Sequence, residues 1–185
     1  PRGGKAAYKE HGMSLIRSMN VHDRRFKEKN LALIDDEQAG KLNNVTLEKD
    51  DVLLNITGAS VARCCVVPDE YLPARVNQHV SIIRVEKDII SPRFICFLLT
   101  STFYKNILLE VGGSGATREA ITKVQLQNFV ITYPDTVEKQ EEFLDELTGI
   151  ESQSIELQNI YTKKIHALDE LKQSILQKAF NGELA

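Results

Sequence analysis

A proline-free segment near the C-terminus, residues 138–180, constrains this chain more than any other part of its sequence. Its apolar residues recur at alternating steps of four and three, which is the a/d repeat of a coiled coil continued over roughly five heptads. A helix of this length would extend about 64 Å and could not bury its apolar stripe against itself. We therefore expect it to pair with another long helix through Leu147, Ile150, Leu157, Tyr161, Leu168, Leu171 and Ile175.

The expected pairing seam has polar interruptions and a wide apolar face. Ser154, Lys164 and Lys178 occupy positions where a two-stranded coiled coil would carry apolar residues. Further apolar residues stand beside the seam, namely Ile155, Ile160, Ile165 and Leu176. A broad face of this kind suits antiparallel pairing or a bundle of more than two helices. The alternative, a long core helix of a bundle domain, lacks comparable helices elsewhere in the sequence.

Residues 1–137 have the pattern of a globular domain. One helix is expected over residues 92–109, with Ser91 as its N-cap and Pro92 at its first position, and a short helical turn at 124–128. Short β-branched and aliphatic runs that are typical of strands occur at residues 14–16, 52–56, 61–67, 80–85 and 129–133. We predict an α+β fold with a curved, mixed or antiparallel sheet in residues 1–137, followed by a long coiled-coil helix in residues 138–185.

Charge is distributed unevenly along the chain. The net charge is −3, but residues 1–30 hold eight Lys or Arg against three acidic residues, a local charge of +5 that leaves −8 for the remainder. A basic region ahead of an acidic helix is compatible with local DNA contact, because binding depends on the face that is presented. Basic residues near a chain end are equally typical of a solvated segment, so the charge pattern alone does not decide between the two.

The three cysteines do not form a recognisable chemical motif. Cys64 and Cys65 are adjacent and Cys96 stands apart, which fits neither a disulfide framework nor a paired CxxC zinc site. We expect reduced, buried thiols in a cytoplasmic protein. No apolar run approaches the ~20 residues that cross a bilayer, so no membrane span is expected.

No catalytic constellation is recognisable either. The glycine-rich segment 112–118 lacks the terminal Lys-Ser/Thr of a P-loop, and it follows a helix instead of opening one. The four histidines, at positions 11, 22, 79 and 166, have no HExxH-type spacing. No residue can be named as catalytic or as a metal ligand, but these absences do not exclude an enzyme. An enzyme that binds a phosphate substrate through segment 112–118 stays open as an alternative.

Polar segments that follow the expected strands and helix give the chain its second set of motifs. Asn, Gln and Arg can form paired hydrogen bonds with base edges, whereas Ser, Thr and backbone amides suit phosphate. Taken alone, each of these loops is more typical of a solvated surface. Taken in order, they resemble the DNA-specificity (S) subunit of type I restriction–modification systems. The resemblance runs through residues 12–21, 51–60, 77–80, 112–118, 134–140 and 171–184.

This resemblance implies a target recognition domain followed by a conserved spacer helix. Full S subunits usually carry two such units, whose helices pack antiparallel and hold two recognition domains on either side of a fixed DNA spacer. The present chain has one unit, so it is either the C-terminal half of a longer subunit or a half-length subunit that dimerises. The S subunit performs no chemistry. S-adenosylmethionine, ATP and Mg²⁺ would be bound by the modification (methyltransferase) and restriction subunits.

The resemblance also indicates which residues would contact double-stranded DNA. The recognition loops would enter the DNA grooves, and the basic residues among the first thirty would supply salt-dependent attraction to the backbone. The alternative is a coiled-coil assembly module with a protein-binding head and no DNA readout. The candidate DNA-contacting residues are Arg17, Asn20, Arg24, Asn55, Thr57, Ser60, Arg63, Asn77, Gln78, His79, Ser114, Thr117 and Arg118.

Overall fold

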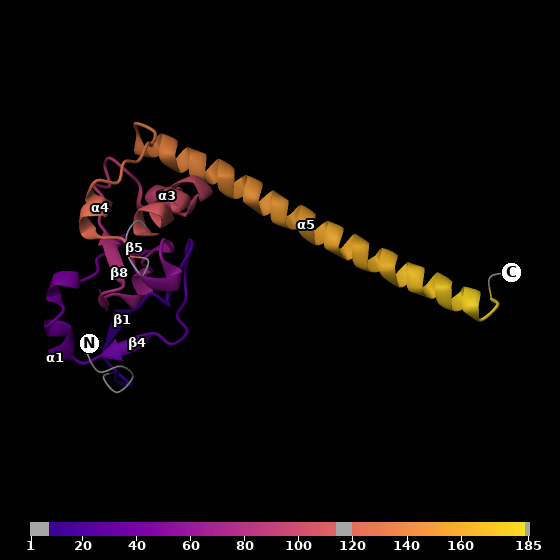
Figure 1. Ribbon diagram of the computed structural model, residues 1–185, viewed down its shortest axis with the longest axis horizontal. Coiled ribbons are helices and arrows are strands. Elements are labelled where there is room, and N and C mark those ends of the chain that lie inside the picture. Colours follow the sequence, from indigo (N-terminus) through magenta and orange to yellow (C-terminus); the bar gives the residue numbers. More distant parts are fainter. Residues whose placement is uncertain (1–7, 114–119, 184–185) are drawn as a thin grey trace. The chain divides into compact units, whose positions relative to one another are not determined.

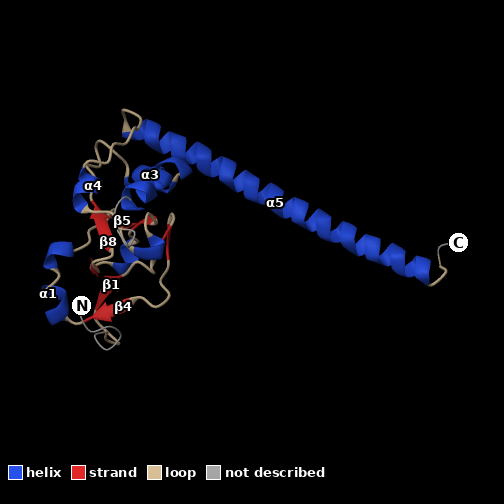
Figure 2. Ribbon diagram, viewed as in Figure 1, coloured by secondary structure: helices blue, strands red, loops and turns tan. Residues whose placement is uncertain are grey.

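The computed structural model describes residues 8–113 and 120–183 (Figures 1 and 2). The chain divides into two compact units, Pro1–Glu141 and Glu142–Ala185. The first unit contains all of the strands and most of the helices, and the second consists of most of the long C-terminal helix. The fold is α+β, as predicted from the sequence.

One small sheet of the globular unit is mixed. Strand β1 (Met13–Ile16) lies between β4 (Ala32–Ile34), to which it is antiparallel, and β7 (Ala74–Val76), to which it is parallel. A separate two-stranded hairpin is formed by β2 (Val21–His22) and β3 (Arg25–Phe26). Strands β2, β3, β4 and β7 were not predicted, because runs of two or three residues are too short to show a period of two.

The second three-stranded sheet is antiparallel and lies at the centre of the core. Strand β5 (Val52–Asn55) pairs with β6 (Cys64–Val66) on one side and with β8 (Val80–Ile83) on the other. Every residue of β5 is buried, as expected for the middle strand of a covered sheet. The strands predicted near β1, β5, β6 and β8 are confirmed. All three cysteines are buried, as predicted, and none is in a disulfide.

The single helix predicted over residues 92–109 is wrong, because the structure has two helices there. Helix α2 (Pro92–Thr100) and helix α3 (Thr102–Gly113) meet at a 71° bend. Ser101 between them has an extended backbone, and its hydroxyl donates to the Leu98 carbonyl at 2.7 Å while the Thr100 hydroxyl donates to the Cys96 carbonyl at 2.9 Å. Such side-chain bonds to the backbone compete with helix continuation.

The helices of the globular unit begin at recognisable caps. Ser91 accepts from the Phe94 amide at the start of α2, as predicted. The predicted helical turn at 124–128 is confirmed as α4 (Lys123–Gln127), which opens with a capping box between Thr122 and Gln125. Helix α1 (Asp36–Gly40) has a side-chain N-cap like that of α2, because the Asp35 carboxylate accepts from the Gln38 amide. Three 3₁₀ turns complete the unit: η2 (Asn43–Val45), η3 (Gly58–Ser60) and η4 (Asp69–Tyr71).

The strand predicted at residues 129–133 is also wrong. This segment belongs to no sheet, and its Thr132 amide donates to the Tyr104 hydroxyl at 2.9 Å instead of to a neighbouring strand. Its β-branched and aromatic composition matches a strand, but no described strand lies beside it to complete a ladder. Composition alone cannot provide a pairing partner.

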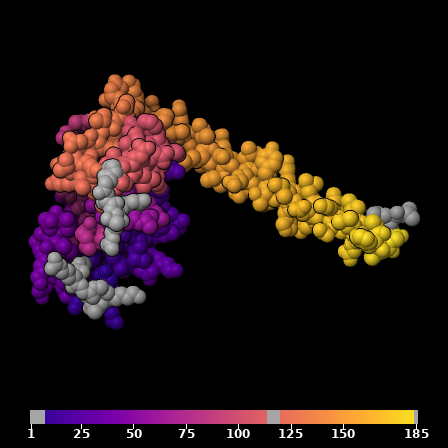
Figure 3. All heavy atoms as spheres, in the orientation of Figure 1, coloured from indigo at the N-terminus to yellow at the C-terminus, as the bar shows by residue number. Residues whose placement is uncertain are grey.

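Helix α5 (Val137–Phe180) confirms the long helix that the heptad pattern predicts. Its 44 residues correspond to about 66 Å at 1.5 Å per residue. It ends at Phe180, and Gly182 beyond it has a φ of 71° that allows the Glu183 amide to donate back to the Lys178 carbonyl at 2.9 Å. Figure 3 shows the atoms of this helix in orange to yellow. Of the seven predicted pairing residues, Leu147 is half-buried and the other six are exposed. Their pairing stays a prediction.

No single described helix is long and apolar enough to cross a membrane. Helices α2 and α3 together have the length and apolar composition of a membrane span, although they are bent. However, α2 buries Phe94, Ile95, Cys96 and Leu99 within the globular unit.

Candidate functional site

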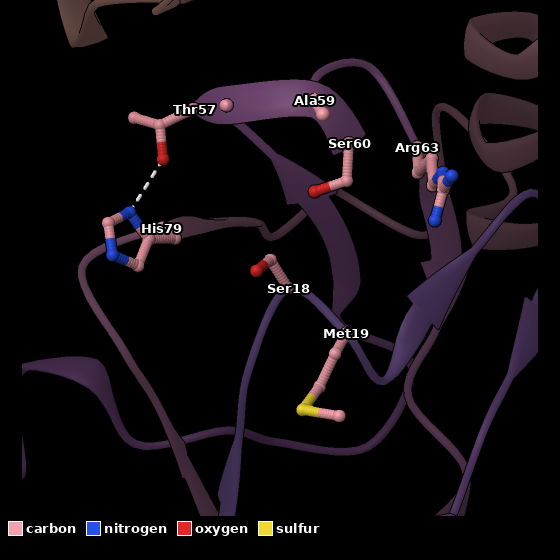
Figure 4. Close-up of a pocket in the computed structure, with 8 residues that line it drawn as sticks. Ser18, Met19, Thr57, Ala59, Ser60, Arg63 and His79 are labelled. Atoms are coloured by element: carbon pink, nitrogen blue, oxygen red, sulfur yellow. Dashed lines mark hydrogen bonds between the residues drawn. The ribbon is translucent and has the colours of Figure 1, made fainter. Parts of the chain in front are cut away.

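A cleft of about 440 Å³, lined by both polar and apolar groups, lies where three segments meet at the ends of strands (Figure 4). One wall is the β5–β6 loop, and the other comes from the turn after β1 and from the residue that precedes β8. Four of the predicted site residues meet here, although they lie up to 22 positions apart in the sequence. The cleft is lined by Ser18, Met19, Thr57, Gly58, Ala59, Ser60, Arg63 and His79.

The β5–β6 loop owes its shape to two residues with positive φ. Asn55 closes the hairpin, since its amide donates to the Arg63 carbonyl at 2.8 Å and its carbonyl accepts from the Ala62 amide at 2.9 Å. Gly58 has a φ of 73°, which glycine adopts without strain, and buried Ala62 has a φ of 65°, which costs energy for a residue with a Cβ atom. The loop therefore presents Thr57, Ser60 and Arg63 on one edge.

His79 joins the two walls of the cleft. Its Nδ1 atom lies 2.6 Å from the Thr57 hydroxyl oxygen, as the dashed line in Figure 4 indicates. The backbone on either side is tied as well, because the Ile56 amide donates to the His79 carbonyl at 3.0 Å and the His79 amide donates to Asn77 Oδ1 at 3.2 Å. Asn77 thus shapes the loop, whereas Gln78 between them is exposed.

Two predicted contact residues, Asn20 and Asn55, are fully buried and hold loops together. Asn20 Oδ1 accepts from the Arg17 amide at 3.1 Å and its Nδ2 donates to the Lys27 carbonyl at 2.8 Å. Asn55 Nδ2 donates to the Ser18 carbonyl at 2.9 Å and to the Ser60 hydroxyl at 3.1 Å. Both Nδ2 groups donate to internal acceptors, and Asn55 Oδ1 is buried without a partner among the described residues, so these two side chains set the shape of the cleft walls and do not face outward.

The β2–β3 hairpin and the segment after it carry exposed basic residues close to the cleft. Arg24, at the hairpin tip with a φ of 55°, has its guanidinium 5.0 Å from the centre of the Phe97 ring. Partial burial lowers the pKa of His22, and the positive charges of Lys27 and Arg63 lower it further. The charges of Lys27 and Arg63 thus both act on His22, and the nearby Asp23 carboxylate opposes them. The exposed basic residues here are Arg24, Arg25, Lys27 and Lys29.

Arg17 lies in a different hollow from the Thr57–His79 cleft. Its guanidinium is 4.8 Å from the centre of the Tyr8 ring and donates to the Asn30 carbonyl. These contacts belong to a second depression of about 410 Å³, which shares only Met19 with the first. The structure therefore does not group Arg17 with the cleft residues.

Three predicted residues, Ser114, Thr117 and Arg118, lie outside the described residues. The segments that flank them are tied to the cleft loop. The Ala120 amide donates to the Gly112 carbonyl at 3.1 Å, and Ala120 forms an isolated β-bridge with Thr57. Glycine suits position 112 because a Cβ atom there would lie only 3.1 Å from the Ile121 side chain, which is closer than an ordinary contact. The described ends of the glycine-rich segment thus adjoin Thr57.

Sequence reasoning missed Ser18 and Met19 as cleft residues. Both residues belong to the polar segment that follows the first predicted strand. Neither side chain can form two hydrogen bonds with one base edge, as the side chains of Arg17 and Asn20 can, so neither was selected. Within residues 8–113 and 120–183, no group of three or more His, Cys, Asp or Glu side chains is placed to hold a metal ion.

Comparison with known proteins identifies the family. Residues 19–167 match the type I restriction modification DNA specificity domain. The chain is 25% identical over 173 residues to the type I restriction enzyme EcoBI specificity subunit of Escherichia coli, and this alignment covers 94% of the chain and 36% of that subunit. The chain thus spans about a third of the length of this curated relative.

Two solved structures share the fold. The HsdS subunit from Thermoanaerobacter tengcongensis superposes with a TM-score of 0.67 at 14% identity, over 90% of this chain and 42% of that one. A chain from a study of complex assembly and conformational transition of the type I R-M system superposes with a TM-score of 0.66 at 23% identity, over 97% of this chain and 42% of that one. Because the family match covers most of the sequence, the chain belongs to the type I restriction modification DNA specificity domain family.

Proposed function

We propose that the globular unit reads one half of a bipartite double-stranded DNA target within a type I restriction–modification complex. The observation that carries this proposal is the cleft, in which Thr57, Ser60, Arg63 and His79 converge from two loops beside the basic β2–β3 hairpin. Hydroxyl and guanidinium groups of this kind can bond to base edges, and lysines and arginines attract phosphates. The family match supports the same assignment.

The long helix α5 would act as the spacer between two recognition units. Its apolar residues from Ile150 to Phe180 are exposed, and a stripe of this length requires a partner helix. That partner would be the helix of a second recognition unit, either in a longer version of this chain or in a second copy, packed antiparallel. The helix length would then set the distance between the two half-sites.

The chain would have no catalytic activity of its own. Modification subunits would supply methyl transfer and would bind S-adenosylmethionine, and the restriction subunit would use ATP and Mg²⁺. This division suits a cytoplasmic complex in which the present chain contributes sequence reading. The cleft lined by Ser60 and Arg63 offers donors for recognition, and the Thr57–His79 hydrogen bond would hold its two walls together.

A binding experiment tests the recognition role. The full chain, assembled with its modification subunits, is titrated with duplex DNA of random sequence and then with duplexes enriched from that pool. We expect enrichment of a defined sequence and an affinity that falls steeply with salt, as required when lysines and arginines displace counterions. The protein-binding alternative predicts no DNA affinity. The enzyme alternative predicts that a nucleotide raises the melting temperature of the chain.

A change in helix length tests the spacer role separately. Deleting one heptad within residues 151–171 shortens the helix by about 10 Å, or roughly three base pairs at 3.4 Å per pair. The enriched DNA should then keep both half-site sequences and change only the number of bases between them. A deletion of the same size that leaves the spacer unchanged would contradict this role for α5.

A further inference from the structure

On the basis of the proposed function, we infer that the edge of the cleft formed by Ser60 and Arg63 presents hydrogen-bond donors that bind a hydrogen-bond acceptor of DNA. The shared ligand chemistry is an acceptor oxygen or nitrogen that faces outward from the duplex. Two parts of DNA offer it: the O6/N7 edge of guanine in the major groove, and the oxygens of a backbone phosphate.

The first step of the argument is the orientation of the buried Asn55 amide. The atom that lies 2.9 Å from the Ser18 carbonyl oxygen must be the nitrogen, because a carbonyl can only accept a hydrogen bond. The same nitrogen lies 3.5 Å from the Val21 carbonyl, which requires the same orientation. The opposite orientation would place two oxygens against each other, so the surroundings fix which side of the amide faces Ser60.

The second step concerns the hydroxyl of Ser60. Asn55 Nδ2 lies 3.1 Å from Ser60 Oγ, and since this nitrogen only donates, the hydroxyl must accept that bond. The hydroxyl hydrogen is then available to donate elsewhere. Within the described parts of the chain, no acceptor is placed to receive it, and Ser60 lines the cleft (Figure 4). Ser60 therefore presents a donor to the cleft.

Arg63 completes the edge. Its guanidinium carries five N–H donors and no acceptor. Among residues 8–113 and 120–183 this guanidinium has no ion-pair or hydrogen-bond partner, and the side chain lines the same cleft (Figure 4). The Thr57–His79 bond does not alter this result, because it involves neither the Ser60 hydroxyl nor the Arg63 guanidinium.

The donors of this edge discriminate among the groups that a duplex presents. Guanine offers two adjacent acceptors in the major groove, and a phosphate offers charged oxygens, so both can accept from Ser60 and Arg63 together. The amino groups of cytosine and adenine are donors and cannot bond to the Arg63 guanidinium, which has no acceptor. We therefore expect the cleft to reject a sequence register that places an amino group against this edge.

The experiment compares variants by parallel selection from a random duplex pool, using the full chain in its complex. The variants are Ser60→Ala, Ser60→Thr and Arg63→Gln, with Arg93→Gln as the matched control, since Arg93 already pairs with Glu141. Ser60→Ala should weaken binding about 2- to 10-fold, the range for one neutral hydrogen bond. Arg63→Gln should weaken it about 5- to 150-fold. Ser60→Thr keeps the hydroxyl and should bind like the original protein.

The pattern of loss distinguishes the two sources of acceptor. A guanine contact predicts that Ser60→Ala and Arg63→Gln relax the preference for one G·C pair, and that 7-deazaguanine at this position weakens binding by the original protein. A phosphate contact predicts a uniform loss with unchanged preference, a salt slope reduced by about one for Arg63→Gln, and sensitivity to a neutral methylphosphonate.

Other results would overturn the inference. If the original protein enriches a sequence but Ser60→Ala and Arg63→Gln behave like Arg93→Gln, the inferred contact of Ser60 and Arg63 with DNA is wrong, whereas the proposed function stands. If Ser60→Thr loses as much affinity as Ser60→Ala while its melting temperature is unchanged, the hydroxyl is not the contact. If the original protein enriches no sequence, the proposed function itself fails.

Discussion

Arg84 and Asp51 form a two-point ion pair that joins β8 to the turn before β5. Arg84 Nε lies 2.8 Å from one oxygen of the Asp51 carboxylate, and Arg84 Nη2 lies 2.7 Å from the other. The carboxylate is almost completely buried and also accepts from the Glu48 amide at 2.7 Å. The hydrogen bond with Asp51 raises the pKa of Arg84 above its usual range. The central sheet is anchored at this end, which is opposite to the end of β5 that carries the cleft loop.

Removing Arg84 should therefore destabilise the globular unit. In the Arg84→Ala variant the Asp51 carboxylate stays buried without its cation, and we expect a loss of about 2–3 kcal/mol in the free energy of unfolding. The matched control is Lys87→Ala, whose ion pair with Asp50 is more exposed and should contribute no more than ~1 kcal/mol. Urea denaturation of the two variants measures the difference. Equal losses would contradict the role assigned to burial.

Gln140 has a comparable role at the beginning of α5. Its side chain is fully buried and makes three hydrogen bonds: Oε1 accepts from the Ser91 amide at 2.8 Å, and Nε2 donates to the Ile89 and Pro134 carbonyls at 3.0 and 2.9 Å. We expect Gln140→Ala to lower the free energy of unfolding by about 1–3 kcal/mol, because it leaves the buried Ser91 amide without its partner, whereas water can reach the part-buried Ile89 and Pro134 carbonyls. The exposed Gln153→Ala on the same helix should change it by less than ~0.5 kcal/mol. Thermal denaturation of both variants provides the measurement.

Long-period features of the fold were predictable, whereas contacts between distant loops were not. The heptad pattern predicted α5 because it repeats over many turns, and the apolar run at 52–56 predicted β5. The bend at Ser101 was missed because its hydroxyl bonds depend on local competition that the apolar pattern conceals.

The site was predicted in part for the same reason. Thr57, Ser60, Arg63 and His79 were selected by residue type, and all four line the cleft. Asn20 and Asn55 have equally suitable chemistry but are buried. The carbonyl that binds Asn55 belongs to Ser18, 37 positions away in the sequence, and no local pattern indicates such a contact. Burial by the tertiary fold therefore decides which polar loop residues face outward.

Ala62 gives a prediction about backbone strain in the cleft loop. Its φ of 65° and complete burial leave no room for a branched side chain, and β-branched residues rarely adopt this conformation. We expect Ala62→Val to lower the free energy of unfolding by about 2 kcal/mol or more. Ala62→Gly should be within ~1 kcal/mol of the original protein, because relief of strain offsets the greater freedom of the unfolded chain. If Ala62→Val were as stable as Ala62→Gly, the backbone strain assigned to position 62 would be refuted.

His22 should make stability depend on pH. Partial burial, followed by the charges of Lys27 and Arg63, lowers its pKa in the folded protein below the ordinary value of 6.5. The unfolded chain then binds more protons than the folded one, so stability rises with pH across this window. The contribution of His22 is fully present above pH 6.5 and is lost as pH falls through the lower, folded pKa.

Two measurements test this titration. In an NMR titration of the full chain, the His22 ring protons should have a midpoint below pH 6.5. The melting temperature of the original protein should fall more than that of His22→Gln between pH 7.5 and pH 5, and Lys27→Gln should reduce this difference because it removes one of the two positive charges. A midpoint at or above 6.5 would contradict the lowering of the His22 pKa by burial and by the charges of Lys27 and Arg63.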